Sequence, residues 1–159
     1  MLYLKVDANQ NVIAANNQFP EECNQPGAWA RDIYGNLGHG WLNRTDITSL
    51  EQAQALADSA SGNLGYPFLA VDRGTHVSPR YDVIEAPMVG DEVSMAFNGD
   101  YYPVGKITRI GAGYKQIKVV GPDGDKVFRR RGGENGPGWL HQRTWRLVDG
   151  KHSRLNQEF

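Results

Sequence analysis

The feature that most constrains the fold is a series of short alternating segments in the second half of the chain. Between residues 88 and 150, apolar and polar residues alternate over several positions, and a tight-turn sequence follows each segment. One of these turns is Asn98-Gly99, the strongest short-range hairpin signal. Five such segments, with turns about every eight to twelve residues, predict a small closed or nearly closed β-barrel. The five predicted strands are 91–97, 101–110, 117–120, 126–129 and 144–148.

The first half of the chain favours an α+β lobe, which we place at residues 1–75. Ser49 and Gln52 have the spacing of a capping box. Apolar residues then recur at helical intervals until Gly62, which is suited to end a helix. The predicted elements are strands at 2–6, 12–14 and 66–71 and one helix over 49–61. The chain is therefore expected to be an α+β protein, with a small α+β lobe followed by a five-stranded barrel.

Three segments show no regular period. Residues 16–45 are rich in Asn, Gly and Pro but contain large apolar side chains, so we expect this loop to pack onto the lobe. Residues 76–87 contain Pro79 and Pro87, which predict an extended connector because proline prevents a helix. Residues 151–159 follow the barrel as a C-terminal tail. The large apolar side chains of the loop are Phe19, Trp29, Ile33, Tyr34, Leu37 and Trp41.

Charge is distributed unevenly along the chain. Residues 1–85 have five basic and ten acidic side chains, a net charge of -5, whereas residues 86–159 have twelve and eight, a net charge of +4. Such asymmetry indicates a basic binding surface, and attraction between the two halves explains it equally well.

The basic residues concentrate around a glycine-rich stretch at 132–138. Guanidinium groups there would contact phosphates, and a tryptophan would stack on a base, so we expect nucleic acid or an acidic protein surface as the partner. The alternative is a charged edge that protects a strand from pairing with other chains. Alternation along a strand places Arg130 opposite to Arg129 and Arg131. The predicted binding residues are Lys126, Arg129, Arg130, Arg131, Trp139 and Arg143.

The residues give little support to catalysis or metal binding. His76, Ser78 and Asp82 are residue types of hydrolase triads, but Ser78 precedes a proline and lacks a nucleophile elbow. Cys23 is the one cysteine, which excludes an internal disulfide, and a lone cysteine in a packed loop beside His39 is usually inert. The histidines lack zinc-binding spacing. We expect no enzyme, no metal and no cofactor. No apolar run approaches the roughly 20 residues that span a bilayer, so we expect no membrane partner.

Several motifs in the second half resemble a known fold. The sequences Gly90-Asp91-Glu92-Val93, Asp100-Tyr101-Tyr102-Pro103 and Gly105-Lys106-Ile107-Thr108-Arg109 resemble the opening of an SH3-like barrel of the Tudor and KOW types. The resemblance covers about residues 87–148 and implies a five-stranded SH3-like barrel at 88–150. Tudor modules hold methylated side chains in an aromatic pocket by cation–π attraction, whereas packing in the barrel core or rim is the alternative role for such rings. The corresponding aromatic residues are Phe97, Tyr101, Tyr102 and Tyr114.

A second set of motifs recurs, in the same order, in another family. These motifs are Ser78–Pro87, Gly90–Pro103, Phe128–Arg130, Trp139–Gly150 and Asn156–Phe159. They are similar to an uncharacterised family of tailed-bacteriophage proteins, which implies a viral origin and brings no activity with it. The expected location is the virion or the host cytoplasm during infection. Two functions stay open: a non-catalytic binder of nucleic acid or of an acidic host protein, and a structural virion component that contacts other virion proteins or itself.

Overall fold

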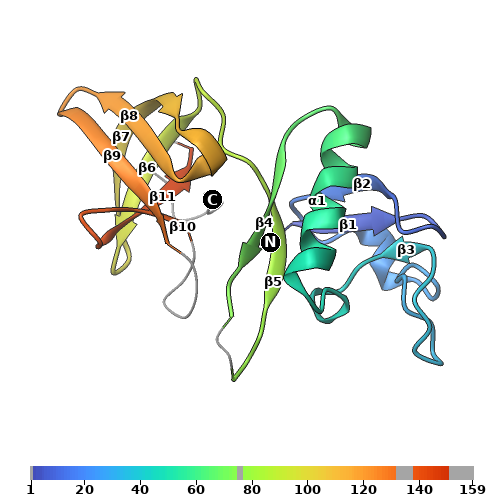
Figure 1. Ribbon diagram of the computed structural model, residues 1–159. Coiled ribbons are helices and arrows are strands. Elements are labelled where there is room, and N and C mark those ends of the chain that lie inside the picture. Colours follow the sequence, from blue (N-terminus) through green and yellow to red (C-terminus); the bar gives the residue numbers. More distant parts are fainter. Residues whose placement is uncertain (1, 75–76, 132–137, 151–159) are drawn as a thin grey trace. The chain divides into compact units, whose positions relative to one another are not determined.

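The chain forms two compact units, Met1–Ala86 and Pro87–Phe159 (Figure 1). The computed structural model describes residues 2–74, 77–131 and 138–150, and in these residues the chain has one α-helix and eleven β-strands. The first unit contains the helix and two small antiparallel sheets, and the second contains a closed antiparallel barrel. The predicted α+β class is confirmed.

The first unit begins with an antiparallel hairpin formed by the predicted strands at 2–6 and 12–14. The Asp7 carboxylate closes its turn by accepting hydrogen bonds from the backbone N–H groups of Asn9 and Asn11, each 2.9 Å long. A short strand from the long loop pairs with the other edge of the first strand, so that the sheet order is β2-β1-β3. The strands are β1 (Tyr3–Val6), β2 (Val12–Asn16) and β3 (Gly40–Trp41).

The helix α1 spans Leu50–Leu64 and begins as its capping sequence predicts. The Ser49 hydroxyl accepts a hydrogen bond of 3.1 Å from the backbone N–H of Gln52. The predicted end at Gly62 is wrong, because the helix continues to Leu64. Gly65, at a φ of 83°, supplies the left-handed residue that terminates it.

The second sheet of this unit is the antiparallel hairpin of β4 (Phe68–Asp72) and β5 (Tyr81–Glu85). Residues 81–85 are extended, as predicted, but they form β5 of the first unit and are not part of a connector. Pro79 and Pro87 exclude a helix but leave the backbone between them free to pair with β4. Helix α1 packs against β2, β4 and β5. The core of the unit is made of Leu4, Val6, Val12, Ala30, Leu42, Ala53, Leu56, Ala57, Ala60, Phe68, Ala70 and Val83.

The long loop at 16–45 is fixed to the unit but does not bury all its apolar side chains. Trp41 is buried, and its indole N–H donates to the Glu22 carboxylate. The prediction of packing is therefore confirmed for Trp41. It is wrong for Ile33 and Tyr34, which are 91% and 83% exposed, and Phe19 is half exposed.

The second unit closes as a barrel of six strands in the order β10-β11-β6-β7-β8-β9. All five predicted strands are present, and the sixth, β10, lies where only a glycine-rich loop is predicted. Gly138 begins β10 with a φ of 141°, and the next residues pair with the arginines of β9. The strands are β6 (Glu92–Phe97), β7 (Asp100–Ile110), β8 (Gln116–Gly121), β9 (Gly124–Arg131), β10 (Gly138–His141) and β11 (Trp145–Asp149).

Two glycines allow β7 and β8 to meet closely at one end of their ladder. A Cβ atom on Gly121 would overlap the backbone oxygen of Val104, and one on Gly105 would overlap that of Val120. Both neighbours are backbone atoms, so they cannot turn aside as a side chain does. The fully buried side chains of the barrel strands include Val93, Ser94, Ile107, Ile117, Val119, Phe128, Trp139, Leu147 and Val148.

Candidate functional site

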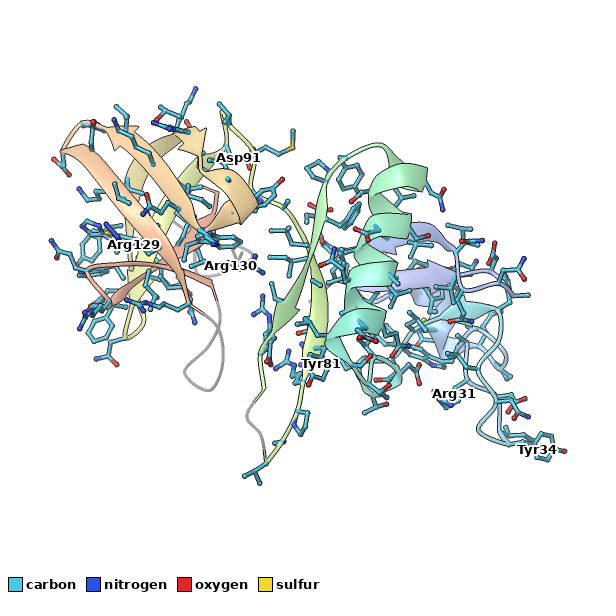
Figure 2. All side chains as sticks on the ribbon, viewed as in Figure 1. Arg31, Tyr34, Tyr81, Asp91, Arg129 and Arg130 are labelled. Atoms are coloured by element: carbon cyan, nitrogen blue, oxygen red, sulfur yellow. The ribbon has the colours of Figure 1, made fainter. Side chains whose placement is uncertain are left out.

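The predicted basic cluster on β9 is divided between the two faces of the strand. Arg129 and Arg131 are exposed, whereas Arg130 is half-buried and lies on the face that carries the buried Phe128 (Figure 2). The alternation expected from the sequence is therefore confirmed. Only Arg129 and Arg131 belong to an outer, solvent-facing surface.

Trp139 belongs to the barrel core. Its side chain is fully buried, its indole N–H donates to the backbone oxygen of Tyr114 at 2.6 Å, and the Arg130 guanidinium lies 5.5 Å from its ring centroid. Burial lowers the pKa of the Arg130 guanidinium, which still carries its charge at neutral pH. The prediction that Trp139 stacks on a base is wrong, because the ring has no accessible face. Arg130 covers that ring and is part of the same packing.

The other two predicted basic residues lie outside the outer surface of β9. Lys126 is half-buried and pairs in register with Val119, whose side chain is inside the barrel. Arg143 is exposed in the turn between β10 and β11, where it takes a φ of 64°. Register therefore does not bring Lys126 or Arg143 beside Arg129.

The structure instead joins Arg129 and Arg131 to two basic residues that the sequence analysis missed. Arg109 on β7 is directly opposite Lys118 on β8, and Lys118 is opposite Val127, the outward-facing residue that precedes Arg129 by two positions. All four basic side chains are exposed. We call Arg109, Lys118, Arg129 and Arg131 the outer basic face. Lys118 could have been recognised from its place between Ile117 and Val119. Arg109 could not, because a register shift between Ile107 and Arg109 changes which residues face outward.

The charges on this face repel one another across the sheet. Like charges directly opposite on neighbouring strands are destabilising, and Arg109 and Lys118 are such a pair. Asp125 offsets part of the repulsion through an ion pair with Lys118 of 3.2 Å, in which the two side chains are 46% and 55% exposed. Such an exposed pair is weak and exchanges readily with another anion. The face is therefore suited to bind a ligand that carries several negative charges.

The predicted aromatic pocket is only partly assembled. Phe97 and Tyr102 both contact Trp145, with ring centroids 5.8 and 5.5 Å apart, and each is about half exposed. Tyr101 precedes Tyr102 on β7 and so faces the other side of the sheet. Tyr114 lies in the 3-10 turn Ala112–Tyr114, where its backbone oxygen accepts the bond from the core tryptophan. The four predicted rings do not form one cage, and the ring that joins two of them, Trp145, was missed.

The residues considered for catalysis are engaged elsewhere or fall outside the described residues. Asp82 binds Arg73 and Arg80 at 3.5 and 3.1 Å, and His76 is not among the described residues. Cys23 is buried, and burial raises the pKa of its thiol. Within residues 2–74, 77–131 and 138–150, no three His, Cys, Asp or Glu side chains are grouped as a metal site. Nor does that part of the chain include a helix long and apolar enough to cross a membrane.

Comparison of the chain with protein-family models, with curated proteins and with solved structures finds no match. Functional interpretation therefore depends on the geometry and charge of the residues themselves.

Proposed function

We propose that this chain is a non-catalytic nucleic-acid-binding protein that contacts phosphates through the outer basic face of its barrel. The observation that carries the proposal is the position of Arg109, Lys118 and Arg129, all exposed, on three consecutive strands of the barrel. Arg109 is directly opposite Lys118, and Arg129 lies two residues beyond the partner of Lys118 on β9. Neighbouring strands are about 4.8 Å apart, a spacing that lets several cations contact successive phosphates of one strand.

The proposed mode of binding is electrostatic and independent of base sequence. Lysine and arginine contacts to phosphates release condensed counterions, so affinity falls steeply as salt rises. Phosphate contacts position a protein on nucleic acid, whereas sequence is recognised through base edges. The outer basic face supplies the first kind of contact. Release of the like-charge repulsion between Arg109 and Lys118 by phosphate adds to the binding free energy.

The sequence motifs support a more specific version of the proposal. We infer that the barrel is a six-stranded relative of the SH3-like fold, with β10 as the added strand. We also infer that the protein comes from a tailed bacteriophage and acts in the host cytoplasm during infection or in the virion. These inferences depend on the motif resemblance, and the phosphate-binding proposal does not require them.

The test is fluorescence anisotropy with labelled duplex DNA, single-stranded DNA and RNA over a salt series. The triple variant Arg109→Gln/Lys118→Gln/Arg129→Gln removes three of the four cations of the outer basic face. For wild type we expect the logarithm of the binding constant to fall linearly with the logarithm of salt. Each lost phosphate contact reduces that slope by about 0.9 for duplex DNA, so the triple variant is expected to lose about 2 to 3 units of slope.

A matched control removes the same net charge elsewhere. The variant Arg44→Gln/Lys126→Gln/Arg143→Gln changes three basic residues that do not belong to the outer basic face, one in the first unit and two in the barrel. It is expected to keep a slope within about one unit of wild type. Equal losses of slope in the two variants would mean that net charge, and not this face, determines binding. Absence of binding to all three nucleic acids at low salt would overturn the proposal and leave an acidic protein surface as the partner.

A further inference from the structure

The long loop of the first unit displays two large apolar side chains in solvent. Ile33 and Tyr34 are 91% and 83% exposed at the tip of a turn, and Tyr34 points away from the unit (Figure 2). Single exposed apolar residues are ordinary on protein surfaces. Two adjacent ones at a tip, almost entirely uncovered, require a reason.

Hydrogen bonds between its own residues close the turn at the tip. The Asp32 carboxylate accepts hydrogen bonds of 2.9 Å from the backbone N–H groups of Tyr34 and Asn36. The same two residues, Asp32 and Asn36, are joined by a backbone bond of 3.0 Å. These bonds restrict the backbone of the tip, which lowers the conformational entropy lost when the tip binds.

The base of the turn is tied to the body of the unit by one arginine. Arg31 donates from Nη1 to the backbone oxygen of Gly35 at 2.6 Å and from Nε to the Asp46 carboxylate at 2.7 Å. Asp46 is 3% exposed, so the carboxylate of this ion pair is buried. The two apolar side chains are thus presented on a fixed support.

A groove lies directly beside the tip. It is lined by the apolar residues Trp29, Ala30, Ile33 and Leu37, by the charged residues Arg31 and Asp32, and by the exposed His39. Most of the accessible lining is apolar. Tyr34 does not line this groove, and its side chain points away from the unit (Figure 2). One short segment, residues 27–39, therefore carries both an apolar projection and an apolar recess.

From this juxtaposition we infer that the chain forms a two-fold symmetric dimer in which Tyr34 of each copy enters the groove of the other. A two-fold interface uses the same patch on both copies, so one symmetry axis fills both grooves at once. Ile33, at the border of each groove, then contacts the incoming ring. The occupant of the groove is a second copy of this chain.

Charge supports self-association at this patch. Residues 1–85 carry a net charge of -5, which would make two copies repel each other over most of that surface. Residues 27–39 contain one arginine and one aspartate, whose charges cancel. The patch is therefore one part of an acidic unit where two copies meet without that repulsion.

The expected dimer is weak. A buried aromatic ring removes roughly 150 to 250 Å² from water. Two tyrosines, two isoleucines and the groove walls then bring the interface near the lower limit of about 1,000 to 1,200 Å² for a specific association. We therefore expect a dissociation constant in the micromolar range.

The test is sedimentation velocity of the full chain from about 1 to about 500 µM, a range that brackets micromolar dissociation. For wild type the mass is expected to rise from 17.7 kDa toward twice that value. Ile33→Ser/Tyr34→Ser removes the projection, and His39→Trp fills the groove from its open side while leaving the projection intact. Each variant is expected to raise the dissociation constant at least about 30-fold, since each disrupts both halves of a symmetric interface.

The control Val77→Ser/Val89→Ser removes two other exposed apolar side chains, 81% and 62% exposed, and is expected to dimerise as wild type does. Circular dichroism of every variant verifies the fold. A wild-type mass that stays at 17.7 kDa over the whole range would overturn the proposal. So would dimerisation of the Ile33→Ser/Tyr34→Ser variant at wild-type affinity. A His39→Trp variant that dimerises normally would exclude the reciprocal arrangement.

Discussion

The barrel and the long loop of the first unit differ in which side chains they bury. The barrel buries Ile117, Val119 and Phe128 and leaves basic side chains exposed on its outer face. The loop leaves Ile33 exposed, and the turn that follows it buries a carboxylate, Asp46. The barrel does this through backbone ladders, which fix side-chain direction by register. In the loop, side-chain direction is determined by hydrogen bonds between polar side chains and the backbone. These bonds do not bury the neighbouring apolar side chains. The two regions therefore expose different surfaces: cationic side chains on the barrel and apolar side chains at the tip of the loop.

The largest expected effect tests how much the stability of the barrel depends on the close contact between the backbones of β7 and β8. Gly121→Ala places a Cβ atom against the backbone oxygen of Val104, which cannot move without separating β7 from β8. We expect a loss of about 3 kcal/mol in the free energy of unfolding, at the upper end for overpacking. Urea denaturation measures the loss. Hydrogen exchange by mass spectrometry is expected to show it in barrel peptides and not in peptides from the first unit.

The matched substitution lies in the first unit. Gly62 is exposed within helix α1, and a Cβ atom added there would meet open space. Gly62→Ala is expected to stabilise that unit by about 0.5 to 1 kcal/mol, because alanine has the higher helix propensity. Similar destabilisation by both alanines would contradict a special role for the β7–β8 approach.

The barrel was largely predictable because one physical signal, alternation between short turns, determines both strand and face. Where that signal is absent, prediction failed. β10 begins at Gly138, in a glycine-rich sequence that is typical of a loop, and it forms a strand by pairing with β9 and β11. The burial of Trp139 follows from that missed strand. Arg109 was missed because a register shift on β7 is decided by the partner strand and not by local sequence.

The next effect tests the buried carboxylate that anchors the loop. Asp46 accepts hydrogen bonds from Arg31 at 2.7 Å and from the backbone N–H of Asn43 at 2.8 Å. Asp46→Asn keeps the size of the side chain but replaces one carboxylate oxygen by an NH₂ group. That group would face either the Arg31 guanidinium or the Asn43 N–H, both of which are donors. We expect a loss of about 2 kcal/mol in the free energy of unfolding, measured in urea. Asp58→Asn, an exposed change on helix α1, is expected to stay within about 0.5 kcal/mol. Equal effects would show that burial of Asp46 is not what fixes the loop.

In the first unit, the sequence predicted the start of the helix better than its end, and it did not predict the pairing of β5. The helix start was correct because Ser49 and Gln52 define it within one turn. The extended conformation of residues 81–85 was expected from Pro79 and Pro87, but their pairing with β4 was not, because the sequence of an extended segment does not show which strand it pairs with. The exposure of Tyr34 was not predictable from its apolar character. It depends on Asp32, whose bonds to the turn hold the tip away from the core.

The smallest effect tests whether Asp32 holds the loop tip. Hydrogen bonds from the backbone N–H groups of Asn36 and Tyr34 lower the pKa of Asp32 below its ordinary value of 3.8. A lowered pKa in the folded state means that the carboxylate stabilises the tip above the unfolded-state pKa, and that this contribution is lost as pH falls through the folded-state pKa. In acid, we therefore expect the Tyr34 and Asn36 amide signals in a ¹H–¹⁵N spectrum to shift with a midpoint below 3.8.

The barrel provides the internal reference for this titration. The amides of Ile117 and Val119 lie on β8, within backbone ladders to both neighbouring strands, and they are expected to keep their positions while the barrel stays folded. Asp32→Asn retains an acceptor oxygen but removes the titrating group, so its Tyr34 amide is expected to show no transition in the same range. If the Tyr34 and Asn36 signals instead move at or above the ordinary aspartate pKa, the carboxylate does not hold the tip. The loop would then lack the fixed support that distinguishes it from an ordinary mobile loop, and the contrast with the barrel would lie in exposure alone.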